Sequence, residues 1–252
     1  MTLYLSRLNL PRRDRCAQRL LGDCHALHRF VMSGFPDVAA RDARNELGVL
    51  YRVEPRSHDD PCVHVLVQSN EAPRWAFESP GYTAEPPRPL DALAAAIGAG
   101  RRFRFRLLAN PTRRVSRRAT EEADPARGRD RPEDPKSVGM RVGVRSEEAR
   151  LAWLKRKGEA AGFQLLAATI SGGIEDPRQS SFDVARADPA AALAGVRQQD
   201  RTRDQLTFET CLFEGILEVT SADALRAALR DGIGPGKAFG CGLLSLAEVR
   251  SP

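Results

Sequence analysis

The sequence predicts an α+β protein made of two tandem βαββαβ units, the ferredoxin-like arrangement. Short apolar runs with the alternation of strands recur along the chain. Helical segments and polar turns separate them, so the order strand, helix, strand, strand, helix, strand can be followed twice. The length of 252 residues is sufficient for two such units and their hydrophobic cores.

The first unit is predicted over residues 1–110. Its expected elements are a strand over Thr2–Leu10, a helix over Arg12–Ser33, strands over Glu46–Glu54 and Cys62–Ser69, a short helix over Leu90–Ile97 and a strand over Arg102–Ala109. Asp14 is expected to cap the first helix, and Gly22 to loosen it. The two middle strands form a hairpin around a proline-bounded turn, and the polar, proline-rich segment 70–89 is expected to be a loop.

The second unit is predicted over residues 111–252. It begins with two strand-like arms, 113–118 and 139–145, around a polar stretch (119–138) that is expected to be mobile. The further expected elements are a helix from Ser146 to about Gly158, a strand over Phe163–Ile170, a long strand over Gln205–Thr220, a helix over Ala222–Arg230 capped by Ser221, and a strand over Leu243–Val249. Between 171 and 203 the pattern indicates at most a strand near Ser181–Ala185.

The positive charge of the chain is concentrated in one stretch. Lys and Arg number 39 against 33 Asp and Glu, a formal net charge of +6. The segment from Arg101 to Arg118 contains eight arginines and no acidic residue. A local excess of this size indicates an anionic partner such as nucleic acid.

The cysteines and the hydropathy exclude several classes of protein. The five cysteines are odd in number and form no Cys-x-x-Cys motif, so neither a disulfide framework nor a zinc knuckle is indicated. Cys24, His25 and His28 lack a fourth ligand at a recognisable spacing, and we expect no metal and no cofactor. The chain has neither a signal-peptide run nor eighteen consecutive apolar residues. We therefore expect a cytoplasmic protein that does not enter a membrane.

Two of the four histidines occur three residues apart in the first predicted helix. On a helix His25 and His28 share a face, Arg29 is next in sequence, and Ser33 lies about one turn further on. Such a group can transfer protons near neutral pH and hold an anion. The same helix has an apolar face, so histidines that only pack at its edge are the alternative interpretation.

The second chemically informative segment is the loop Gly232–Gly242, in which five of eleven residues are glycine. Glycine allows backbone N–H groups to point at a bound anion, and Lys237 adds a positive charge. Asp231 and Ala238 occupy positions where a Walker A loop needs glycine and Ser or Thr. The segment therefore indicates a loop that binds a phosphodiester, with a glycine-rich turn that binds nothing as the alternative.

Several segments together resemble the CasE family, the CRISPR repeat-RNA endoribonucleases of type I-E systems. They are Leu3–Arg7, Leu27–Arg29, Arg104–Pro111, Ala152–Lys157, Phe213–Gly215 and Gly232–Ser245. The resemblance runs nearly from end to end and is weakest over 171–203. It implies two ferredoxin-like domains, metal-independent cleavage of the repeat on the 3′ side of its hairpin, and retention of the product in the Cascade surveillance complex.

The resemblance also assigns catalytic residues. His28 falls on the catalytic histidine of the family, and His25 falls where members usually carry a tyrosine. Ser33 lies where some relatives have a basic residue, so Lys237 or Arg29 would carry more of the charge stabilisation. A neutral His25 would then take the 2′-hydroxyl proton while a protonated His28 serves the leaving oxygen, which predicts a bell-shaped rate profile between about pH 5.5 and 8.

The expected partners are a CRISPR repeat RNA with a stem-loop and other Cascade subunits. The stem would be held by its shape and backbone charge. The residues expected to bind it are Arg29, Arg113, Arg114, Arg117, Arg118, Arg141, Lys155, Gly234, Gly236 and Gly240. Two alternatives are a noncatalytic RNA-binding subunit of the same architecture and a basic scaffold that uses the glycine loop for a protein contact.

Overall fold

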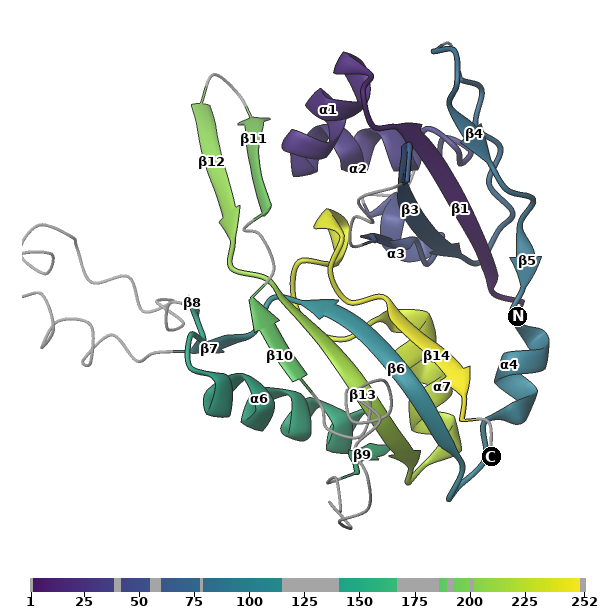
Figure 1. Ribbon diagram of the computed structural model, residues 1–252, viewed down its shortest axis with the longest axis vertical. Helices are drawn as coiled ribbons and strands as arrows, with labels where there is room; N and C mark the ends of the chain where they lie inside the picture. Colours follow the sequence, from purple (N-terminus) through teal and green to yellow (C-terminus); the bar gives the residue numbers. More distant parts are fainter. Residues whose placement is uncertain are drawn as a thin grey trace, which may run out of the picture.

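A computed structural model describes residues 2–38, 42–54, 60–77, 79–114, 141–166, 186–189, 193–199 and 202–249, and between 186 and 207 it describes the backbone. Within these residues the protein has a mixed α/β fold with antiparallel sheets (Figure 1). None of the described helices combines the length and the apolar character needed to cross a membrane.

The first sheet is built from the N-terminal third of the chain. Its elements are β1 (Tyr4–Pro11), α1 (Arg15–Gly22), α2 (Cys24–Met32), α3 (Ala43–Glu46), β2 (Leu50–Val53), β3 (Cys62–Ser69), β4 (Thr83–Ala84) and β5 (Arg88–Pro89). The strands lie in the order β2-β3-β1-β4, and β5 also pairs with β1. All these pairs are antiparallel, and the longest runs from Tyr4 opposite Ser69 to Pro11 opposite Cys62. The antiparallel pair of β2 and β3 confirms the predicted hairpin.

The predicted helix over 12–33 is two helices. Asp14 caps α1 as expected, because its carboxylate accepts a hydrogen bond from Ala17 N. The break comes at Asp23, one residue after the predicted weak point, where the backbone is extended. The Asp23 carboxylate accepts hydrogen bonds from His25 N and Ala26 N, so a second N-cap starts α2 immediately before the histidine pair.

The second sheet is built from the rest of the chain. Its elements and their neighbours are α4 (Asp91–Ala96), β6 (Arg102–Ala109), β7 (Thr112–Arg114), β8 (Arg141–Gly143), α6 (Glu147–Ala160), β9 (Phe163–Leu165), β10 (Arg186–Pro189), β11 (Leu193–Gln199), β12 (Thr202–Phe208), β13 (Cys211–Val219), α7 (Ala222–Asp231), η2 (Lys237–Phe239) and β14 (Leu244–Glu248). The strand order is β10-β13-β6-β14, with β9 also paired to β13. Ser146 and Ser221 cap α6 and α7, as predicted.

The position of β6 corrects the predicted order of strands. Its bounds are as predicted, but it does not complete the first sheet; it pairs with β13 on one side and with β14 on the other. The free edge of β1 is instead covered by β4 and β5, from the segment predicted to be a loop. Strands of two residues show no alternation, so the sequence pattern could not reveal them.

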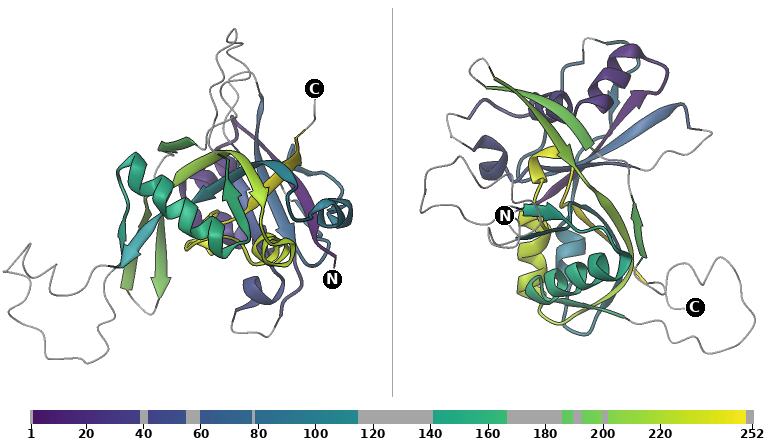
Figure 2. Two further views of the ribbon diagram at one scale, coloured as in Figure 1. Left: turned by 90° about the horizontal axis from the view of Figure 1, so that it is seen from below. Right: turned by 90° about the vertical axis from the view of Figure 1, so that its left-hand side faces the viewer.

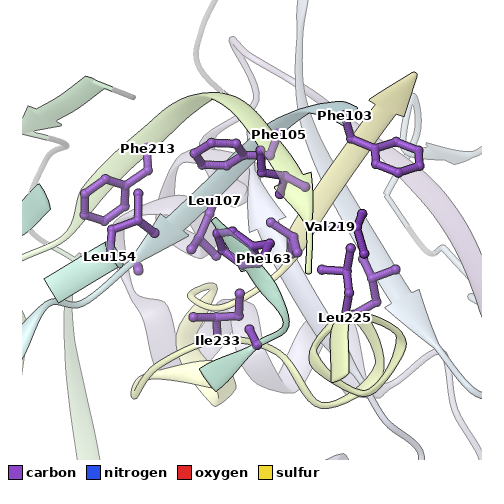
Figure 3. Close-up of a cluster of buried hydrophobic side chains, with 14 of the residues drawn as sticks. Phe103, Phe105, Leu107, Leu154, Phe163, Phe213, Val219, Leu225 and Ile233 are labelled. Atoms are coloured by element: carbon purple, nitrogen blue, oxygen red, sulfur yellow. The ribbon is translucent and has the colours of Figure 1, made fainter. Parts of the chain in front are cut away.

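The core beneath the second sheet explains this choice of partners. Alternate residues of β6, Phe103, Phe105 and Leu107, are buried against side chains of α6 and α7 (Figure 3). Leu93 and Ala96 of α4 pack against the same cluster. The apolar face of β6 is thus buried by its place in the second sheet, against α6 and α7.

Three further differences concern the middle of the chain. The arms predicted around the polar stretch do pair, as β7 and β8, but they form a separate two-stranded sheet. The long strand predicted over 205–220 is divided into β12 and β13, and β12 forms a hairpin with β11 that the sequence did not indicate. This hairpin lies beside α1 and α2 (Figures 1 and 2). The predicted strand over 181–185 and the polar stretch 119–138 lie outside the described residues.

A partly buried ionic network joins the two sheets. The Arg52 side chain of β2 donates to the backbone carbonyls of Arg106 and Leu243 and to the Glu54 carboxylate. The same Glu54 accepts from Arg106 of β6 at 2.7 Å, and Arg106 also donates to Glu214 of β13. The helix α2 packs with the first sheet, and the glycine loop leads into β14 of the second sheet. These bonds between the sheets therefore fix the position of the glycine loop relative to α2.

Candidate active site

The histidine pair and the glycine loop come together around one aromatic ring. Phe239 lies on η2, within the loop, and its ring centroid is 6.0 Å from that of His28 and 6.5 Å from that of His25. The ring of Phe208, from the end of β12, lies 5.1 Å from Phe239. Two segments about 200 residues apart in sequence thus form one site, with both imidazoles on the side of α2 that faces the loop.

His28 is half-buried, and its surroundings disfavour a positive charge. Burial lowers the pKa of its imidazole, and the neighbouring charges of His25 and Arg44 lower that pKa further, while Asp42 opposes them. Within the described part of the chain, no group hydrogen-bonds the buried Nδ1 atom of His28. An imidazolium would place an N–H there without an acceptor. The neutral form of His28 is therefore favoured in the free protein.

The glycine loop is shaped by backbone conformations that require glycine. Gly236 and Gly240 both have left-handed φ values, 82° and 85°, and stand on either side of the short helix η2. A Cβ atom on Gly240 would lie 3.2 Å from the ring of Tyr51. These two glycines are thus needed for the turn itself and for close packing.

Tyr51 ties the loop to the histidine helix. Its side chain is buried, and its hydroxyl lies within hydrogen-bond distance of two carbonyl oxygens, Ala238 O at 3.1 Å and Cys24 O at 3.4 Å. Ala238 belongs to η2, and Cys24 is the first residue of α2. One buried hydroxyl therefore bridges the two segments that carry the candidate catalytic residues.

Lys237 is the first residue of η2 and is half-buried. Burial lowers the pKa of its amine, and the charge of Arg44 lowers it further, while Asp231 opposes these effects. Like His28, Lys237 therefore sits where positive charge is already present, and a bound anion would be favourable there.

Three clefts, which we name the histidine, loop and basic clefts, adjoin these residues. The histidine cleft (about 480 Å³) is lined by His28, Met32, Ser33, Phe35, Pro36, Asp37, Val38, Asp42, Ala43 and Arg44. The loop cleft (about 770 Å³) is lined by Arg44, Asn110, Thr112, Arg141, Gly143, Phe208, Glu209, Gly234, Pro235, Gly236, Lys237, Ala238 and Phe239. The basic cleft (about 850 Å³) includes Arg113, Arg114, Arg141, Arg156, Lys157 and Lys237 in its lining.

Shared lining residues connect the three clefts in series. Arg44 lines both the histidine cleft and the loop cleft. Arg141 and Lys237 line both the loop cleft and the basic cleft. A path thus leads from His28, past Arg44 and Lys237, to a surface rich in arginine and lysine.

The structure brings most of the predicted catalytic residues to this path. His28 and Ser33 line the histidine cleft, Lys237 lines the other two, and His25 adjoins Phe239. The Ser33 hydroxyl donates a hydrogen bond of 2.8 Å to Phe30 O. Arg29 is exposed on α2 and lines none of the three clefts.

The predicted RNA-binding residues divide into three groups. Arg113, Arg114 and Arg141 line the basic cleft from β7 and β8, and Gly234 and Gly236 line the loop cleft. Lys155 is exposed on α6 outside these clefts, and Gly240 packs on Tyr51. Arg117 and Arg118 lie outside the described residues.

Several residues of the site were not predicted from the sequence. They are Arg44, Tyr51, Arg156, Lys157 and Phe239. Arg156 and Lys157 directly follow the predicted Lys155. Successive residues of a helix point in different directions, so a helical projection of α6 would have shown that these two residues lie on other faces than Lys155. Arg44 and Tyr51 belong to no motif, so only their position in space assigns them to the site.

Comparisons with known proteins agree with this geometry. The family model described as "CRISPR associated protein" matches residues 3–248. The chain is 32% identical over 246 residues to the CRISPR-associated endoribonuclease Cse3 of Thermus thermophilus, covering 97% of this chain and 100% of that protein. It is 29% identical to the Cascade subunit CasE of Escherichia coli, covering 90% and 93%.

A solved structure extends the similarity to the fold. The structure of the CRISPR endoribonuclease Cse3 bound to a 19-nucleotide RNA superposes with a TM-score of 0.71 at 29% identity, covering 97% of this chain and 99% of that one. Sequence and structure are thus similar over almost the whole length of both chains, and the chain belongs to the CasE/Cse3 family of CRISPR-associated proteins.

Proposed function

We propose that this protein is an endoribonuclease that cleaves CRISPR precursor RNA on the 3′ side of the repeat hairpin, without a metal ion, and keeps the product as a Cascade subunit. The observation that carries the proposal is that His25 and His28 lie against Phe239 of the glycine loop, two residues from Lys237, and that connected clefts lead from His28 past Lys237 to a basic surface. The names of the relatives, an endoribonuclease and a Cascade subunit, support it. The cytoplasmic location expected from the sequence stays a prediction.

The reaction needs only groups that this chain supplies. The 2′-oxygen of the RNA attacks the adjacent phosphorus, the bond from phosphorus to the 5′-oxygen breaks, and a 2′,3′-cyclic phosphate is left. One group accepts the 2′-hydroxyl proton, and another gives a proton to the 5′-oxygen. The Lys237 amine stabilises the additional negative charge on the phosphorane.

The surroundings of His28 favour one division of roles over the other. Because burial and nearby positive charges lower its pKa, His28 is neutral over more of the pH range than an ordinary histidine. A neutral imidazole can accept the 2′-hydroxyl proton. We therefore assign the base to His28 and the acid to His25, the reverse of the assignment expected from the sequence.

The basic cleft fits the stem of a hairpin RNA. It collects six basic side chains from four segments, β7, β8, α6 and the glycine loop. Double-stranded RNA is held mainly through its backbone charge and shape, because side chains cannot read its deep major groove. A stem in the basic cleft would place the strand that leaves it along the loop cleft, toward His28.

The topology supports two ferredoxin-like units with a boundary earlier than residue 110. In the second sheet the order β14-β6-β13, with β9 and β10 beyond β13, is that of a βαββαβ unit that starts at β6. The first sheet has the corresponding order, with β4 and β5 as its last strand and no helix before them. We place the boundary near Leu90, because α4 packs in the second core.

A cleavage assay in the presence of a chelator tests the proposed function. The substrate is a 5′-labelled repeat hairpin RNA, and the control is the same RNA with a single 2′-deoxy nucleotide at the cleavage site. We expect cleavage of the first to a product with a 2′,3′-cyclic phosphate, and binding without cleavage of the second. Tight binding of both without cleavage would support the noncatalytic RNA-binding subunit instead.

A further inference from the structure

Arg44 occupies the junction between the histidine cleft and the loop cleft. It is the residue that lines both of these clefts, with His28 in one and Lys237 in the other. Its side chain is half-buried, and two hydrogen bonds hold the guanidinium, from Nη1 to Val49 O at 3.1 Å and from Nη2 to Asn45 Oδ1 at 3.2 Å. The group is therefore placed before any ligand arrives.

The guanidinium of Arg44 brings a positive charge close to both His28 and Lys237. Within the residues that the structure describes, no carboxylate lies at ion-pair distance from its guanidinium. The charge acts on both neighbours, since it contributes to the lowered pKa values of His28 and Lys237. Arg44 thus shares one cleft with His28 and the next with Lys237, and its charge favours an anion at their junction, while Asp37 and Asp42 line the histidine cleft further on.

We propose that Arg44 binds the nonbridging oxygens of the phosphate at the cleavage site, between His28 and Lys237, and stabilises the pentavalent phosphorane. The proposal rests on the function proposed above. A guanidinium has five N–H donors, and the two hydrogen bonds to Val49 and Asn45 leave others for a phosphate. Arg44 takes no part in the proton transfers, which involve only the base and the acid.

The other candidates for this charge are less well placed. Ser33 lines the histidine cleft but is uncharged, and its hydroxyl is engaged with Phe30 O. Arg29 is exposed and lines none of the three clefts. Lys237 lines the loop and basic clefts but not the histidine cleft. Of these side chains, Arg44 alone lines both the histidine cleft and the loop cleft.

A purely structural role for Arg44 predicts different behaviour. Its bond to Val49 O connects α3 with the start of β2, and the Val49 N–H donates in return to Arg44 O. If this connection were its only purpose, loss of the side chain would lower the melting temperature, and a small soluble cation would not restore the rate. The test therefore needs a readout that depends on the charge itself.

The experiment measures single-turnover cleavage of the repeat hairpin at saturating protein, for Arg44→Gln, Arg44→Lys and Arg44→Ala. Arg101→Gln serves as the matched control, because Arg101 pairs with Glu248 at 3.2 Å, away from the clefts. We expect a loss of about 100-fold for Gln and Ala and a smaller one for Lys. Added guanidinium at low millimolar concentration should restore part of the rate of Arg44→Ala and leave Arg101→Gln unchanged.

Melting temperatures and affinities for the 2′-deoxy RNA show whether each variant is folded and binds. Rates within about threefold of wild type for a folded Arg44→Gln protein would overturn the proposal. So would a slow Arg44→Ala protein that guanidinium does not rescue, since Arg44 would then act as a structural residue. A wild-type protein that binds the RNA without cleaving it would remove the proposed function, and this proposal with it.

Discussion

At the scale of single residues, the candidate site depends on how two histidines are surrounded. His25 and His28 have the same side chain and contact the same phenylalanine ring. Burial and nearby charge lower the pKa of His28, with one ring nitrogen left without a partner among the described residues. A difference in environment would allow two chemically identical side chains to take the opposite roles in proton transfer that we propose for them.

His28→Ala is expected to reduce single-turnover cleavage by about a hundredfold or more, the usual effect of losing one acid or base. Binding of the 2′-deoxy RNA should change little. The matched control is His64→Ala, because His64 contacts Asn9 and Asp60 on the first sheet. Cleavage near the wild-type rate by a folded His28→Ala protein would remove His28 from the mechanism.

The pH dependence of the rate separates the roles of the two histidines. Measured at protein concentrations below saturation, the profile reports the free protein. The base must be neutral, so the rate should rise with pH through the pKa of His28, which lies below the ordinary histidine value of about 6.5. It should fall again at higher pH, where the acid loses its proton.

His25→Tyr should keep measurable activity and lose the alkaline limb of this profile between about pH 5.5 and 8, since a tyrosine titrates near pH 10. His25→Ala should lose more activity, because no group remains to protonate the leaving oxygen. Loss of the acid limb in His25→Tyr would instead return the base role to His25, and a wild-type rate and profile in His25→Ala would mean that His25 only packs.

At the scale of elements, the arginines of one sequence segment are divided between two tasks. Arg101 and Arg102 pair with Glu248 and Glu218 at the end of the second sheet. Arg113 and Arg114, on β7, line the basic cleft. The sequence shows one positive run, whereas the strand pairing brings Arg101 and Arg102 to carboxylates and puts Arg113 and Arg114 in the lining of the basic cleft.

Arg113→Ala together with Arg114→Ala should weaken RNA binding and flatten the dependence of log K on log salt, by about 0.7–0.9 for each phosphate that the protein no longer neutralises. Affinities measured between roughly 50 and 300 mM salt give this slope. The control is the double substitution of Arg101 and Arg102 by Ala, for which we expect an unchanged slope. Equal slopes for both double variants would mean that β7 is only a solvated surface.

At the scale of the whole molecule, the site depends on contacts between the two sheets. Arg52 of β2 is buried, and its side chain makes hydrogen bonds to Arg106 O, Leu243 O and Ser245 Oγ on the side of the second sheet. Gln68 of β3 adds a buried bond to Leu229 O of α7. These contacts join the part that carries the histidines to the part that carries the glycine loop and the basic cleft.

Arg52→Met should lower the free energy of unfolding by about 3–5 kcal/mol, because the backbone carbonyls of Arg106 and Leu243 lose the donor Arg52 and the Glu54 carboxylate keeps only its bond from Arg106 among the described residues. Urea unfolding measures this. Arg102→Met is the matched control on an exposed ion pair, with an expected change of about 0–1 kcal/mol. A loss of similar size in both variants would show that the network between the sheets contributes no more than a surface pair.

The sequence by itself determined the local properties of this protein. The bounds of β3 and β6, the caps at Asp14, Ser146 and Ser221, and the glycine loop all follow from residues that are neighbours in the chain. Helix periodicity likewise put His25 and His28 on one face. Each of these properties depends on interactions within a few residues, which a sequence pattern records directly.

Only the tertiary structure decided which segments meet. It gave β6 to the second sheet, placed Arg44 between His28 and Lys237, and set Tyr51 between α2 and η2. An alternating strand fits either sheet equally well by its pattern, and an arginine outside any motif is one among many. Which partner it finds depends on burying a common core and satisfying buried polar groups across the whole chain, and no local pattern contains that information.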